Sequence, residues 1–213
     1  MSINLRKGQK IDLTKGGGGL SRIMVGLGWD EAQPAPQQSS GGLFGLFKSQ
    51  PPQQQTQDID CDASAILLNA NGKLYGNNAN DCCVYFGNLS HYSGAIQHQG
   101  DNLTGAGEGD DEQIMVDLSR VPADVAKIVF VVNIYDANVR GQHFGMIQNA
   151  FIRLVNLANN YEICKFNLSE NYYGMTGMVV GEIYRYNGEW KFNAIGQPVK
   201  EASRLQSLLN LYV

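Results

Sequence analysis

The sequence lacks three features that would each indicate a class of function. No apolar run approaches the roughly 18 residues that a membrane-spanning helix needs, so we do not expect a spanning protein. Lys and Arg number 16 against 20 Asp and Glu, which leaves no cationic excess for phosphates and disfavours a nucleic-acid partner. The first residues contain no apolar signal core and no cleavage site, which predicts a cytoplasmic protein.

Cysteine is scarce, with four residues, and no Cys-x-x-Cys pair is present. A zinc ribbon or a thioredoxin-type redox site is therefore disfavoured. Cys82 and Cys83 are adjacent, and on a strand they would point to opposite faces, where they could not bridge each other. We expect reduced thiols that serve as small core residues. A soft-metal or metalloid contact at Cys82 and Cys83 is the functional alternative.

The length of 213 residues predicts a single domain, residues 1–213, with one unusual insertion at 31–57. The insertion contains four of the six prolines and eight glutamines, a composition that cannot bury enough apolar surface to order itself. We interpret it as a disordered segment between two strands. Within it, Leu43–Phe47 is apolar. Those residues either collapse onto the domain surface or bind a partner or a membrane surface.

The rest of the chain has the pattern of short strands with little helix. Alternating or continuous apolar runs predict strands at 21–29, 63–68, 113–118, 127–135, 150–157, 161–168, 179–186 and 189–194. Asn187-Gly188 suits a type I′ turn, so the last two strands should form a hairpin. Short helices are expected at 200–209 and 142–148. Short strands with glycine-rich turns indicate a mainly β protein, an antiparallel β-sandwich.

The acidic residues are concentrated in two segments that together hold nine of the 20. In 58–62, Asp58, Asp60 and Asp62 share one face of an extended chain and repel one another. The second segment, 100–117, has no Lys or Arg and contains Asp101, Glu108, Asp110, Asp111, Glu112 and Asp117. Asp30, at a strand end, could join them. Calcium takes six to eight oxygen ligands and offsets such repulsion, whereas magnesium usually uses one or two carboxylates, so calcium is favoured.

Three other interpretations of the acidic loop are weaker. An EF-hand would need a ligand where Leu103 stands, a glycine where Ala106 stands, and flanking helices. A phosphate-binding loop would need a Lys-Ser/Thr pair, and its acids would repel phosphate. The third interpretation is a solvent-exposed turn that binds no ion, but nine acids in two short segments favour a cation site.

At these residues the sequence resembles the TerD family of tellurium-resistance and general stress proteins. Nine motifs carry the resemblance in order along the chain: Val25–Asp30, Asp60–Ala65, His98–Asn102, Gly105–Glu112, Val116–Leu118, Val121–Val125, Phe144–Gly145, Asn149–Arg153 and Gly188–Phe192. The apolar motif within the insertion resembles the TerZ-type branch. The resemblance implies a calcium-binding, C2-like β-sandwich whose metal sites are built from acidic loops.

The resemblance also implies a ligand set, and two acidic segments favour two calcium ions. The candidate metal ligands are Asp30, Asp60, Asp62, Asp101, Asn102, Glu108, Asp110, Asp111 and Glu112. Less certain contributors, as ligands or in support of ligands, are Asp58, Thr104 and His98.

Three hypotheses for function follow. The first is a calcium-binding stress-response protein associated with tellurite resistance, which acts by binding or assembly rather than catalysis. The second is a calcium-dependent adaptor that attaches to a membrane surface or to other stress-response proteins through Leu43–Phe47, which would place it at the membrane periphery. The third is a metal-dependent enzyme. Its histidines, His91, His98 and His143, lie in no recognised catalytic motif, and His98 either orients a ligand or is structural.

Overall fold

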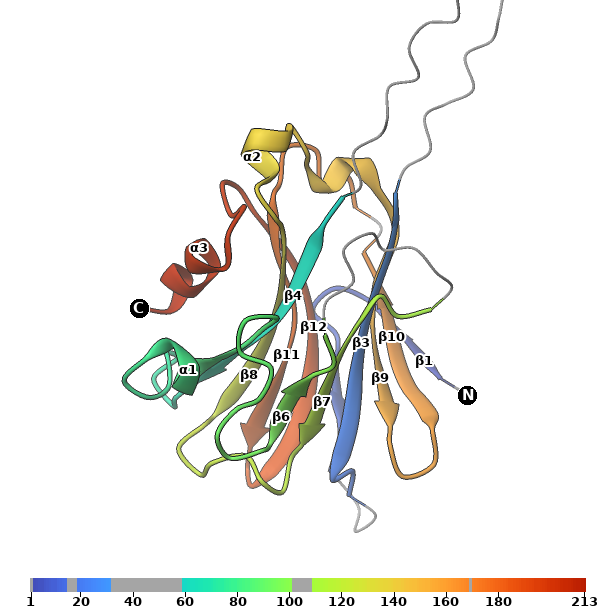
Figure 1. The fold of residues 1–213 in the computed structure, drawn as a ribbon. Coiled ribbons are helices and arrows are strands. Elements are labelled where there is room, and N and C mark those ends of the chain that lie inside the picture. The colour runs from blue at the N-terminus through green and yellow to red at the C-terminus, as the bar shows by residue number, and fades with distance from the viewer. Residues whose placement is uncertain (1, 15–18, 32–58, 101–108, 169) are drawn as a thin grey trace, which may run out of the picture.

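The computed structural model describes residues 2–14, 19–31, 59–100, 109–168 and 170–213. Within these residues, two six-stranded sheets pack face to face (Figure 1). The first sheet has the order β1 (Ile3–Leu5), β10 (Tyr161–Asn167), β9 (Ile147–Asn156), β3 (Arg22–Glu31), β7 (Glu112–Asp117) and β6 (Ile96–His98). The second has the order β2 (Lys10–Asp12), β12 (Glu189–Val199), β11 (Gly177–Tyr186), β8 (Lys127–Ile134), β4 (Cys61–Leu68) and β5 (Cys83–Val84). The predicted mainly β sandwich is confirmed.

Each strand predicted from the apolar pattern is present. The continuous β-branched run at 127–135 forms β8, which is buried from Ile128 to Ile134 because one face meets the opposite sheet and the other is covered. The predicted hairpin joins β11 to β12, and Asn187 and Gly188 have φ values of 52° and 79°. These positive angles are those that a type I′ turn requires.

The helices were predicted less well. The C-terminal helix α3 covers only Leu205–Leu209 and continues as a 3₁₀ turn at Asn210–Tyr212, so the predicted start at residue 200 is wrong. Strand β12 takes the chain as far as Val199, and Glu201 has a φ of 59°, a left-handed conformation that a helix starting at residue 200 would not contain. The expected helix at 142–148 is also wrong. A 3₁₀ turn occupies Phe144–Met146, and Ile147 already pairs in β9.

The four cysteines are free and buried, as expected for small core residues. Cys82 and Cys83 do not share a strand, so the strand geometry considered for this pair does not apply. Helix α1 (Ala79–Cys82) ends at Cys82, and β5 begins at Cys83. Asn78 caps this helix by accepting backbone N–H groups with its side chain, a local signal that strand periodicity does not show.

Most pairings between strands are antiparallel, but β1 runs parallel to β10. The main core lies between the two sheets and includes Ile23, Phe130, Leu154 and Phe192. A second apolar cluster lies on the outer face of the second sheet, under α3. The predicted insertion, with Leu43–Phe47, lies outside the described residues except for Glu31 at the end of β3. No helix in the described part of the chain is long and apolar enough to cross a membrane.

Candidate cation-binding site

One end of the sandwich gathers acidic residues from both sheets. Strand β3 ends at Glu31 and strand β4 begins at Cys61 at the same end of the sandwich, which is the upper end in Figure 1. Leu27 pairs with Glu112 in an antiparallel register, which brings the start of β7 beside the last residues of β3. The acidic segments at 58–62 and 109–112 are far apart in sequence, yet the two sheets bring their described residues to the same end.

Asp111 is fixed on the last residues of β3. Its backbone N–H donates to the Leu27 carbonyl oxygen at 2.8 Å, and its Oδ2 accepts the Trp29 backbone N–H at 2.7 Å. Burial raises the pKa of the Asp111 carboxyl group above its ordinary value, and the Trp29 N–H partly offsets this. Asp30 and Asp110 raise the Asp111 pKa further, because each adds negative charge beside it. Asp111 is therefore repelled by both of these carboxylates.

The pKa of the Cys61 thiol is also affected by the carboxylates at this end of the sandwich. Cys61 is the first residue of β4, and its side chain packs in the core between the sheets. Burial raises the pKa of this thiol well above its usual value, and the carboxylates of Glu112, Asp62, Asp60 and Asp111 raise it further, in that order. Four carboxylates from two sheets thus act on one buried atom, which gives this end of the molecule a negative potential.

Asp110 has a different role from its acidic neighbours. Its carboxylate accepts two hydrogen bonds from Arg153, from Nε at 2.7 Å and from Nη2 at 2.9 Å. Gln113 donates to the same carboxylate at 3.2 Å. A Cβ atom on Gly26 would lie only 2.3 Å from the Asp110 carboxylate, so this pair is packed directly against β3. Charge and hydrogen-bond partners for Asp110 therefore come from the protein itself.

Glu112 and His98 point between the sheets and join their edges. The Ala63 backbone N–H in β4 donates to Glu112 Oε2 at 2.5 Å, and His98 Nε2 lies 3.2 Å from the Ala63 carbonyl oxygen. His98 Nδ1 accepts the Gly100 N–H at 3.1 Å, which places the imidazole proton on Nε2. His98 Nε2 is also 3.6 Å from Glu112 Oε2. Because β5 pairs with β4 only at Ala65 and Ile66, these two side chains take the place of a neighbouring strand at Ala63.

The other acidic candidates lie around this end on the outer faces. Asp30 accepts a hydrogen bond from Asn149 Nδ2 at 2.7 Å. Asp60 precedes β4, with its Oδ2 3.9 Å from Arg140 in α2 (Ala137–Arg140). Asp62 accepts from Asn133 Nδ2 at 3.0 Å.

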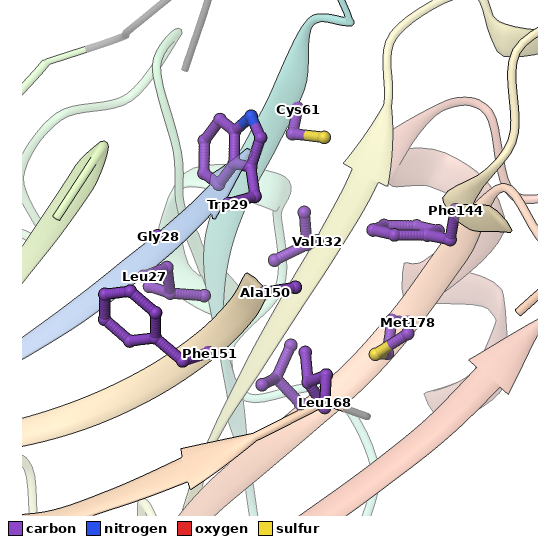
Figure 2. Close-up of a pocket in the computed structure, with 11 residues that line it drawn as sticks. Leu27, Gly28, Trp29, Cys61, Val132, Phe144, Ala150, Phe151, Leu168 and Met178 are labelled. Carbon is purple, nitrogen blue, oxygen red and sulfur yellow. The ribbon is translucent and has the colours of Figure 1, made fainter. Parts of the chain in front are cut away.

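A small apolar pocket lies beneath the acidic end, between the sheets (Figure 2). Its volume is about 20 Å³, which is room for about one water molecule. Trp29, Cys61 and Phe144 lie around it with aliphatic neighbours. Trp29 Nε1 is buried and has no hydrogen-bond partner among the described residues. This pocket is too small and too apolar to hold a substrate.

The described residues account for part of the predicted ligand set. They bring Asp30, Asp60 and Asp111 to one end, attach Asp110 to Arg153, and turn Glu112 and Asp62 toward other partners. Asp58, Asp101, Asn102, Thr104 and Glu108 lie outside the described residues. Among the residues that are described, no group of three or more His, Cys, Asp or Glu side chains is arranged to hold a metal ion.

Sequence reasoning missed three polar partners of the acids: Asn133, Asn149 and Arg153. Asn133 left a signal, since it is the one polar residue between Ile128 and Ile134 in a β-branched run. Asn149 and Arg153 lie within one of the motifs of the resemblance, but their pairing with Asp30 and Asp110 depends on the register of β9 against β3.

Comparisons with known proteins agree with this architecture. The TerD domain pattern matches residues 1–212. Stress response protein SCP2 of Bacillus subtilis (strain 168) is 52% identical over 214 residues, covering 100% of both chains. Tellurium resistance protein TerD of Serratia marcescens is 43% identical, covering 92% of this chain and 91% of its own.

A solved structure shares the fold. A homologue of telluride resistance protein TerD from Streptomyces coelicolor A3(2) superposes with a TM-score of 0.59 and 20% identity, covering 86% of this chain and 92% of its own. With a domain match from end to end and close relatives of full length, the chain belongs to the TerD family of tellurium-resistance and stress-response proteins.

Proposed function

We propose that this protein binds calcium at the acidic end of the sandwich and serves a stress response associated with tellurium resistance by binding rather than by catalysis. Family membership supports the stress and tellurium part of the proposal. The calcium part depends on the chemistry of the acidic end.

The observation that carries the calcium proposal is the repulsion of the Asp111 carboxylate by Asp30 and Asp110. Of these three carboxylates, Arg153 is hydrogen-bonded to Asp110, and its Nη1 also pairs with Glu162. A divalent cation beside Asp111 and Asp30 would offset the repulsion between their carboxylates and would use carboxylate oxygens, the ligands that calcium prefers. Binding would therefore stabilise the folded chain.

The fit of calcium to the described residues is partial. Asp30 lies close enough to Asp111 to raise its pKa, and Asp60 precedes β4 on the facing sheet, but no three described carboxylates are arranged to hold an ion by themselves. Three carboxylates supply fewer oxygens than the six to eight that calcium takes. The sequence predicts the remaining ligands in Asp101, Asn102 and Glu108, which lie outside the described residues, and backbone carbonyl oxygens or water would complete the site.

Calorimetric titration with calcium, combined with thermal unfolding, tests the proposal. We expect heat of binding and a higher melting temperature with the unaltered chain, because an ion that binds only the folded state stabilises it. Asp111→Asn should lose both effects. Asp124→Asn is the matched control, because it makes the same change of charge in the exposed loop before β8, at the opposite end of that strand.

Two results would overturn this function. Absence of heat at millimolar calcium, together with an unchanged melting temperature, would remove calcium from the account. Steady turnover of a phosphoester or of tellurite that disappears in Asp111→Asn would replace binding by catalysis. The adaptor hypothesis depends on Leu43–Phe47, outside the described residues, and stays a prediction from the sequence.

A further inference from the structure

A second candidate site lies on the outer face of the second sheet, away from the facing core. Helix α1, the turn after β5 and helix α3 enclose a pocket of about 360 Å³ over β4 and β8. Figure 1 shows α1 and α3 on the same side of these two strands. A volume of this size is typical of sites for small organic molecules.

The floor of the pocket is polar in an apolar surrounding. Asp62 in β4 and Asn133 in β8 are cross-strand partners, and both line the pocket. On the same outer face of the second sheet, the next residues are apolar. They are Ile66, Val129 and Val131, which pack under α3. Asp62 is 5% exposed and Asn133 is 1% exposed.

Asn133 has acceptor capacity that the described residues leave unused. Its Nδ2 donates to Asp62, but its Oδ1 is buried without a hydrogen-bond partner in this part of the chain. A buried acceptor without a donor destabilises the folded chain, and a ligand that supplies a donor relieves that cost. A carboxylate and an amide oxygen side by side are suited to a ligand that brings several N–H donors.

The charges around the pocket favour a cation. Arg204 is the one basic residue that lines it, and this side chain is engaged by Asp136 at 3.0 Å. Arg140, on the neighbouring helix, lies beside Asp60. Both arginines thus lie beside a carboxylate other than Asp62, which is the one acidic residue that lines the pocket in the described part of the chain.

The walls are aromatic and aliphatic. Tyr85, Phe86 and Tyr135 line the pocket with leucines of α3, and the rings of Tyr85 and Phe86 meet edge to face at 5.4 Å. Phe86 and Tyr135 are exposed at the rim. Aromatic faces attract organic cations as well as apolar groups. A bare metal ion would find too few oxygen ligands among these carbon-rich walls.

We propose that this pocket binds a small organic cation, with an ammonium or guanidinium group on Asp62 and Asn133 and an apolar body between the aromatic rings and α3. This pocket is separate from the proposed calcium site, and its binding is tested in the presence of a chelator. Either proposal can therefore fail while the other holds.

Phenethylamine and 2-phenylethanol form a suitable pair of probes, because they differ only in the ammonium group. Nuclear magnetic resonance titration in EDTA should show phenethylamine shifting the signals of Asp62, Asn133 and Tyr85. The alcohol should bind at least about tenfold more weakly, since a hydrogen bond to a charged group is worth about 1.5–3 kcal/mol.

Two variants and a control make the test decisive. Asp62→Asn should weaken phenethylamine about tenfold or more. Ala79→Phe, at an exposed residue that lines the pocket, should block it by filling space without altering the core. Asp124→Asn should leave binding unchanged. Equal affinity for amine and alcohol, or full amine affinity in Ala79→Phe, would overturn the proposal. Loss of calcium binding in Asp62→Asn with unchanged amine binding would likewise overturn it and return Asp62 to the metal site.

Discussion

Replacing Glu112 by alanine removes the acceptor of the Ala63 N–H, which is the contact that ties the first sheet to the edge of β4. Glu112 is 1% exposed, so water cannot replace the lost carboxylate without entering the core. The orphaned N–H costs about 1–3 kcal/mol. Loss of one buried methylene group adds about 0.8 kcal/mol. The expected destabilisation is therefore about 3 kcal/mol.

Urea unfolding in EDTA measures this effect without any contribution from a bound cation. For a chain of this length, 3 kcal/mol corresponds to a fall in melting temperature of about 6–12 °C. Glu112→Gln keeps an oxygen for Ala63 but places an amide near His98, so it should cost about 1 kcal/mol. Asp124→Ala, in an exposed loop, is the control. A loss below about 0.5 kcal/mol for Glu112→Ala would refute the reasoning, because surface changes lie within that range.

Three further outcomes follow from the same geometry. Asp110→Asn should destabilise the chain by about 1–3 kcal/mol in urea unfolding, because Arg153 loses a charged partner that it holds through two hydrogen bonds; an unchanged midpoint would contradict this. Gly28→Val should cost about 2 kcal/mol or more in the same assay, since a Cβ there would lie 2.5 Å from the Phe151 ring, and a neutral effect would show that the ring moves freely. Burial raises the pKa of the Cys164 thiol to about 12, so its contribution to stability is full below the pKa of the unfolded thiol and is lost as pH rises toward 12. Unfolding between pH 8 and pH 11 should show a shallower decline for Cys164→Ala, and identical slopes would count against the shift.

Much of the fold was readable from local patterns. The β-branched run that became β8 and the Asn187-Gly188 turn each depend on residues adjacent in sequence, so periodicity and turn chemistry suffice. The shortest strands were not predicted, because β1 and β2 have three residues each and form only by pairing with strands distant in sequence. The helix expected at 142–148 failed for the same reason, since pairing of β9 with β3 overrides local preference.

The candidate site was predictable in composition but not in arrangement. The clustering of acids indicated a negative end of the molecule, and Asp30 and Asp111 do meet there. Sequence alone could not show that Asp110 would pair with Arg153, or that Glu112 would turn inward to Ala63. Both outcomes depend on which face of β7 meets the opposite sheet. Nor could it show that Asp62 would face a pocket under α3.

A crystal structure determined after soaking in calcium is the most direct test of the central claim. The account predicts an ion about 2.3–2.6 Å from carboxylate oxygens of Asp111 and Asp30, with further oxygens from the segment that precedes Gly109. Asp110 should still be bound to Arg153. An ion bound elsewhere, or no ion at calcium concentrations that saturate the calorimetric titration, would contradict the account.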